Sequence, residues 1–249
     1  MVSVLWLLPL GVAVGILAAI LGIGGGLVIV PVLNFLGATP VQATATSLVG
    51  VLLGATAATL QNWWSQNLQG RLVIYLALPA LLTTELGVKL ATILPPRYLL
   101  FTFALLLVTA IFLLDFKKRL TLHENTPQLV RGTPIIGAVA GLLSGMLGVG
   151  GGLVMVPLQM LWLGQNIKDA IRSSLGAITI ISLWGVVSHG LKGNVLWAEG
   201  FLLGTGTVLG GQWGAKLLPK LPDRLVNQLF RLFLVVMATY MVYKAWQGG

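Results

Sequence analysis

Eight apolar stretches, most of them close to twenty residues long, follow one another along the chain and constrain its fold more than any other feature. A helix needs about 20 residues, at a rise of about 1.5 Å per residue, to cross the roughly 30 Å of hydrocarbon in a bilayer. The sequence therefore predicts an all-α integral membrane protein. The stretches are Val4–Leu21, Val41–Leu60, Leu72–Leu94, Tyr98–Phe116, Thr133–Leu147, Asp169–Ser188, Val195–Leu217 and Leu225–Tyr243.

The charged residues are too few to cover a soluble protein. They make up 8% of the 249 residues, against about 25% in a soluble domain, and the 57% hydrophobic content also excludes a disordered chain. A net charge of +9 would suggest nucleic-acid binding in a soluble protein. Here the basic residues lie between apolar stretches without forming a stripe, so they indicate orientation in a lipid bilayer and no nucleic-acid partner. The first apolar stretch lacks a preceding Lys or Arg and an Ala-x-Ala exit, which favours a retained span over a cleaved signal peptide.

The two halves of the chain repeat one another. Residues 22–31 read GIGGGLVIVP and residues 148–157 read GVGGGLVMVP, which are identical at eight of ten positions with an offset of 126. After a one-residue insertion, a Gly-x-Lys-Leu pattern followed by Leu-Pro-x-Arg recurs at 87–97 and 214–224. We therefore predict two copies of one transmembrane unit, residues 1–116 and 132–249, joined by a polar linker at 117–131.

Each unit contains four or five helical segments, depending on the short apolar pieces Leu27–Leu36 and Leu153–Leu163. If these pieces enter the membrane and return, the units are parallel and the basic residues divide seven against seven between its two sides. If they cross, the units are inverted and the division is ten against four. The positive-inside rule favours the second arrangement, with both termini outside, although the pieces are short for a crossing.

Each short piece follows a glycine triplet, and the triplets are the best candidates for a binding site. Unwound backbone at membrane depth is tolerated where it is buried in protein or lines a wet cavity. Glycine N–H groups, together with the N-terminus of the helix that restarts after them, would attract an anion. Close helix packing also uses Gly-xxx-Gly spacing, and we assign that role to Gly11, Gly15, Gly137 and Gly141. The candidate binding residues are Gly24, Gly25, Gly26, Gly150, Gly151 and Gly152.

Hydroxyl side chains begin the next helix of each unit. They can donate to an anion or bond back to a carbonyl one turn earlier, and the sequence leaves both roles open. Arg172 precedes the second pair; its guanidinium could bind an oxyanion or serve as an interfacial charge. The candidates at these helix starts are Thr46, Ser47, Arg172, Ser173 and Ser174.

Other polar residues in the apolar stretches have weaker interpretations. Glu85 precedes Lys89 by four residues, which predicts a helical ion pair, with a proton-coupling role for Glu85 as the alternative. His189 is predicted at the membrane interface. The chain has no His-Glu-x-x-His, Gly-x-Ser-x-Gly or Walker motif and no cysteine. The sequence therefore predicts no enzyme, no cofactor and no metal site, and it specifies no oligomeric state.

The duplicated Gly-x-Gly-Gly-Gly-x-x-x-x-Pro motif, followed in each unit by an Ala-x-x-[Thr/Ser]-Ser helix start, resembles the TauE/SafE sulfite exporter family of bacterial membrane proteins. The resemblance covers essentially the whole chain. It implies a multi-pass protein of the bacterial inner membrane that moves sulfite, thiosulfate or organosulfonates, usually outward. The motif itself does not identify the substrate.

These observations together predict a secondary transporter with a midplane anion site between the two triplets. Broken helices at matching positions of two repeats are typical of such a site. The alternative is a membrane scaffold or assembly factor without transport activity, in which the glycines serve packing alone.

Overall fold

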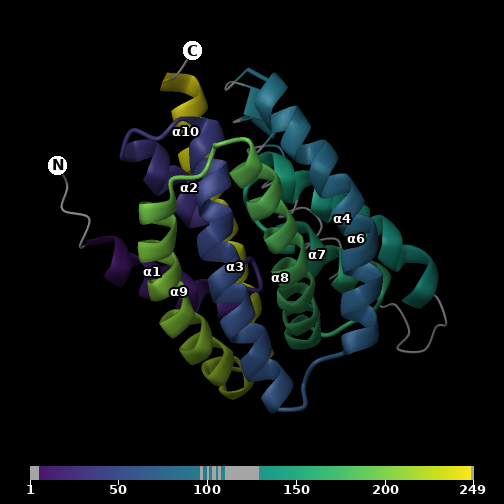
Figure 1. Ribbon diagram of the computed structural model, residues 1–249. Coiled ribbons are helices and arrows are strands. Elements are labelled where there is room, and N and C mark those ends of the chain that lie inside the picture. The colour runs from purple at the N-terminus through teal and green to yellow at the C-terminus, as the bar shows by residue number, and fades with distance from the viewer. Residues whose placement is uncertain are drawn as a thin grey trace.

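The computed structural model describes residues 6–95, 98–99, 101–102, 105, 108–109 and 129–247, and the regular structure in this part of the chain is entirely helical (Figure 1). The predicted all-α membrane fold is confirmed. The first half contains α1 (Leu7–Leu21), α2 (Gly26–Phe35), α3 (Pro40–Trp64) and α4 (Gly70–Ile93). The second half contains α6 (Leu129–Leu147), α7 (Gly152–Trp162), α8 (Ile167–Leu191), α9 (Trp197–Leu217), the short 3-10 turn η2 (Leu218–Lys220) and α10 (Asp223–Gln247).

Three of the described helices, α3, α4 and α8, are long and apolar enough to cross a membrane. The short helices α2 and α7 have 10 and 11 residues, about half the length that a full crossing needs. The span predicted at Tyr98–Phe116 lies largely outside the described residues. Helix α6 begins at Leu129, inside the segment predicted as the polar linker.

Helices α3 and α8 both begin at a polar cap. The Thr39 hydroxyl accepts a hydrogen bond from the Gln42 backbone N–H, and the Gln42 side chain accepts one from the N–H of Thr39. This capping box, followed by Pro40 at the first helical position, fixes the start of α3. Asn166 caps α8 in the same way by accepting from the N–H of Asp169 at 2.9 Å. The caps place the predicted hydroxyl residues within the first two turns of both helices.

Paired glycines let the outer helices approach closely. Helices α1 and α9 lie on one side of the bundle and α4 and α6 on the other, with α3 and α8 between them (Figure 1). A Cβ on Gly15 would lie 2.6 Å from the Thr207 carbonyl oxygen, and one on Gly141 would meet the Ala80 carbonyl oxygen. Gly11 and Gly137 face backbone carbonyls of the same two partner helices. The packing role predicted for these four glycines is confirmed.

The outer surface of the bundle is apolar. Phe35, Leu82 and Leu191 are 83%, 77% and 86% exposed, although residues of this type are normally buried in a protein surrounded by water. Leu82 lies on α4 and Leu191 ends α8, the helices long enough to span. Exposed apolar side chains along spanning helices are expected where lipid is the solvent.

Candidate functional site

Both helices that precede the triplets stop where the sequence predicts. Helix α1 ends at Gly22 with φ 69°, and α6 is followed by Gly148 with φ 70°. The next helix is capped in each half by a second left-handed glycine, Gly25 at φ 86° and Gly151 at φ 80°. Glycine adopts this backbone without the steric cost that other residues incur. The predicted helix breaks are therefore confirmed.

The two triplets lie against each other at the centre of the molecule. A Cβ on Gly26 would meet the Gly148 carbonyl oxygen, and one on Gly152 would meet the Gly22 carbonyl oxygen. Gly24 and Gly150 share the same neighbours, because a Cβ on either would lie 2.9 Å from Val51 Cγ1 and within about 3.1 Å of Ile178 Cγ2. The triplets thus serve close packing between the halves, whatever else they do.

Backbone donors in both loops lack acceptors. The first N–H groups of any α-helix have no acceptor within the helix, and at α2 and α7 no side-chain cap supplies one. Buried N–H groups without partners are rare, and each costs about 1–3 kcal/mol. The N–H groups without a hydrogen bond to the part of the chain that the structure describes include those of Gly24, Gly25, Gly26, Leu27, Gly150, Gly151, Gly152 and Leu153.

The hydroxyls of the first half hold the two halves together. Ser47 Oγ lies 2.7 Å from the Thr44 carbonyl oxygen and 2.9 Å from the Gly148 carbonyl oxygen, and donates toward both. Thr46 Oγ1 accepts from the backbone N–H of Leu196 at 2.9 Å. The structure therefore brings Ser47 to the crossing of the triplets, whereas Thr46 faces the start of α9.

The hydroxyls of the second half belong to a buried network around Gln159, a residue that the sequence reasoning missed. Ser173 Oγ donates to Gln159 Oε1 at 2.8 Å, and Gln159 Nε2 donates to Ser174 Oγ at 2.7 Å. Ser173 also lies 2.6 Å from the Asp169 carbonyl oxygen. All three side chains are at most 1% exposed. The signal was a glutamine inside the apolar run of the short helix α7.

Arg172 is engaged by a carboxylate. Its Nη1 lies 3.0 Å from Asp169 Oδ1, one turn earlier on α8, and its side chain is 12% exposed. Its buried Nε has no partner among the described residues. The structure therefore places Arg172 in an ion pair in the second turn of α8.

One weaker interpretation from the sequence, the Glu85–Lys89 ion pair, is wrong, and His189 makes a contact that the sequence did not reveal. Glu85 pairs with Lys192 at 3.5 Å and accepts from Ser188 Oγ at 2.6 Å, so its ion-pair partner comes from the other half rather than from Lys89. His189, in the last turn of α8, is fully buried and its Nε2 lies 3.2 Å from the Gly145 carbonyl oxygen, so its ring contacts protein. Periodicity along one helix did not reveal either contact between helices.

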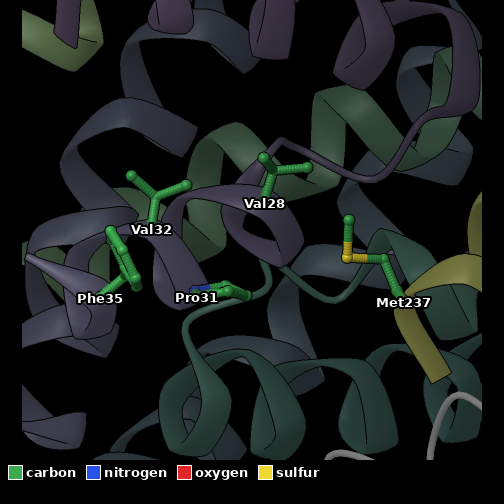
Figure 2. Close-up of a pocket in the computed structure, with 5 residues that line it drawn as sticks. All are labelled: Val28, Pro31, Val32, Phe35 and Met237. Atoms are coloured by element: carbon green, nitrogen blue, oxygen red, sulfur yellow. The ribbon is translucent and has the colours of Figure 1, made fainter. Parts of the chain in front are cut away.

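A separate cavity of about 280 Å³ opens on one flank of the molecule. Figure 2 shows Met237 of α10 on the far side of this cavity from Val28 and Pro31 of α2. Val32 and Phe35 complete its apolar lining. It contains none of the candidate binding residues. No cluster of His, Asp or Glu that could hold a metal ion occurs in the described parts of the two halves.

An all-α membrane bundle with helix breaks at matched glycine triplets is typical of membrane transporters. The chain belongs to the TauE/SafE sulfite exporter family, whose model matches residues 7–241. The relatives it matches are named as probable membrane transporter proteins, not as enzymes.

Three of these relatives cover nearly the whole chain. A protein of Xylella fastidiosa is 28% identical over 95% of this chain and 94% of its own length. YunE of Bacillus subtilis is 26% identical over 96% and 97% of the two chains, and a Haemophilus influenzae protein is 30% identical over 97% and 98%. No solved structure matches the chain significantly.

Proposed function

We propose that this protein is a secondary transporter that moves small sulfur-containing anions, such as sulfite, thiosulfate or organosulfonates, by alternating access around a midplane site between the triplets. The observation that carries the proposal is the set of buried, unpaired N–H groups at the starts of α2 and α7. Two helix N-termini there add partial positive charge. An oxyanion is the ligand that satisfies such donors.

The side chains around the crossing fit an anion as well. Helices α2, α3 and α7 contain no acidic residue, so no carboxylate from these elements would repel the ligand. The hydroxyls of Ser47, Ser173 and Ser174 are neutral donors once their internal bonds are exchanged. The candidate glycines, with Thr46 and Arg172 toward the rim, would then line the path to this site.

The described conformation corresponds to a closed state in this mechanism. Ile23, Val149, Val51 and Ile178 are 0–1% exposed around the triplets, which encloses the unpaired donors. The Ser47–Gly148 hydrogen bond joins the halves at the same place. Access from either side would require the halves to part here, first toward one face of the membrane and then toward the other.

The paired contacts support a two-fold relation between the two halves, which in this proposal are inverted repeats that cross the inner membrane of a bacterium many times. Gly22 faces the backbone of Ile171 as Gly148 faces that of Thr44, and these positions correspond in the two halves. The division of basic residues by ten to four then places the linker face inside the cell.

The membrane potential favours export of such a substrate. One charge is worth about 2.3 kcal/mol per 100 mV, so a dianion leaving an inside-negative cell gains roughly 4.6 kcal/mol before any concentration gradient. Uptake would require a coupled ion. Export can therefore proceed without coupling.

Flux in proteoliposomes with an imposed potential tests the proposal. Thiosulfate, sulfite and sulfoacetate are compared with sulfate, acetate and chloride. We expect saturable, potential-driven flux of at least one of the three candidate anions. Gly151→Ala should abolish it, because the left-handed backbone is strained by a side chain and the new Cβ would lie 2.8 Å from the Ala140 carbonyl oxygen.

Gly164→Ala is the matched control, since Gly164 is also left-handed, with φ 66°, but no atom lies within 4 Å of the new Cβ. It should retain flux. The second candidate function, a scaffold, is favoured by the packing of Gly26 and Gly152 on backbone carbonyls. Well-folded wild-type protein without flux of any of these anions would favour the scaffold and contradict the proposal.

A further inference from the structure

Ser144, near the end of α6, has a hydroxyl that the fold leaves unused. The residue is 0% exposed and its Oγ has no hydrogen-bond partner among the described residues. Other buried hydroxyls of these helices have a partner; Ser182, for example, bonds back to the Ile178 carbonyl at 2.6 Å. An orphaned buried hydroxyl costs about 1–3 kcal/mol. A ligand that accepts from it would remove this cost.

The position of Ser144 is defined by its neighbours on α6. A Cβ on Gly151 would lie 3.0 Å from Ala140 Cβ, and Ser144 follows Ala140 by four residues on the same helix face. In the first half, the Cβ position of Gly25 lies 3.4 Å from Ala18 Cβ. Ala18 is the counterpart of Ser144 at the offset of 126. Helix spacing and the correspondence of the two halves therefore indicate that Ser144 lies beside the cap of α7.

We infer that Ser144 and the N–H groups at the start of α7 form the primary oxyanion subsite of this transporter, in the second half alone. The inference rests on the proposed function and names one side chain that recognises the substrate. Four backbone N–H groups, from Gly150 to Leu153, and one hydroxyl lie at this end of α7 without acceptors from the described chain. The first half offers the N–H groups, but alanine in place of the hydroxyl.

The ligand class follows from the donors. All of them are neutral and the helix N-terminus is partially positive, so the subsite suits an anion with several acceptor oxygens on one atom. A sulfite or thiosulfate oxygen can accept from Ser144 while a neighbouring oxygen accepts from the backbone. Chloride, a single atom, cannot bridge the donors in this way.

The test compares Ser144→Ala with wild type in proteoliposomes supplied with ³⁵S-labelled thiosulfate and, in parallel, ³⁵S-labelled sulfite. We expect KM to rise at least about tenfold, the loss typical of a hydrogen bond to a charged group. The unfolding temperature should stay the same or rise, because the variant removes an unsatisfied group. Ser182→Ala is the control, a buried serine whose hydroxyl is already bonded, and it should leave KM unchanged.

The swapped variant Ala18→Ser/Ser144→Ala tests the restriction to one half. It should remain as impaired as Ser144→Ala, whereas recovery would overturn a subsite confined to the second half. An unchanged KM in Ser144→Ala would overturn the subsite and leave the proposed function standing. A KM increase accompanied by a lower unfolding temperature would assign Ser144 a structural role instead. Absence of flux for both anions in the wild type would overturn the proposed function and the subsite with it.

Discussion

The two halves of this transporter share a backbone but differ in their buried chemistry. Both contain the same left-handed glycines, the same orphaned N–H groups and the same close crossing. At three positions the second half has a polar side chain where the first has an apolar one. The pairs are Ala18 and Ser144, Leu33 and Gln159, and Ala45 and Arg172.

This difference separates two requirements at the centre of the molecule. The glycine backbone lets the two halves approach and presents N–H donors in both. The side chains distinguish one half from the other, so the ligand of the proposed site would meet unequal half-sites. We therefore interpret the centre of the molecule as two similar backbone loops, of which the second has the more specialised side chains.

The largest loss of stability should come from substitutions at the glycines where the two halves are in backbone contact. Gly26→Ala and Gly152→Ala each direct a methyl group at a backbone carbonyl of the opposite half. Both carbonyls belong to the backbone and yield less easily than the end of a side chain, so we expect each variant to lose about 3 kcal/mol of stability. Folded yield by size-exclusion chromatography in detergent and the unfolding temperature measure the loss, which should be similar in the two halves.

Gly70→Ala is the control for these variants, because nothing lies within 4 Å of the added Cβ and the glycine begins α4. It should be neutral or slightly stabilising, as alanine is the better helix former. A Gly152→Ala protein as stable as wild type would contradict the crossing. A loss confined to one of the two triplets would contradict the equivalence of the two backbones.

The sequence predicts the parts of this fold that depend on local residues. Helix breaks at Gly22 and Gly148 follow from three consecutive glycines, which no apolar helix tolerates without cost. The packing roles of Gly11 and Gly137 follow from their spacing. Each of these features depends on a few neighbouring residues, so its physical cause is visible in the chain.

Contacts between the halves were not predictable in this way. Glu85 and Lys192 are 107 residues apart, and the local rule of four-residue spacing favoured Lys89 instead. Gln159 and Ser144 could have been found by another signal. Aligning the halves shows a polar residue in one copy where the other has leucine or alanine, and such a difference inside an apolar segment marks a position that packing alone does not explain.

A smaller effect is expected from making the second half resemble the first at Gln159. Gln159→Leu introduces the residue found at Leu33 and leaves Ser174 Oγ without its donor. An unsatisfied buried hydroxyl costs about 1–3 kcal/mol, so the unfolding temperature should fall. Ser173 keeps its contact with the Asp169 carbonyl oxygen and limits the loss.

The double variant Gln159→Leu/Ser174→Ala sharpens this test. Removing both partners leaves no orphan, so the pair should be less destabilised than the sum of the two single variants. Thermal unfolding of the wild type, the two single variants and the double variant completes this double-mutant cycle. Additive losses would show that the network between α7 and α8 contributes nothing beyond packing.

The smallest effect should come from Glu85, whose counterpart in the second half is Gln212. Glu85→Gln removes the ion pair with Lys192, in which both side chains remain about one-third exposed. Pairs of this exposure contribute about 0–1 kcal/mol. The glutamine oxygen can still accept from Ser188. We therefore expect a decrease in unfolding temperature of a few degrees at most, and less at high salt because salt screens the pair.

Two double-mutant cycles decide which lysine the carboxylate meets. Glu85→Gln combined with Lys192→Met should show coupling in thermal unfolding, whereas Glu85→Gln combined with Lys89→Met should be additive. Coupling to Lys89 alone would restore a contact within one helix and remove this link between the halves. Coupling to Lys192 would mean that an ion pair holds α4 of the first half to the end of α8. The corresponding residues, Gln212 for Glu85 and Ser65 for Lys192, are uncharged and cannot form such a pair. The asymmetry of the two halves would then extend from the centre of the bundle to its rim.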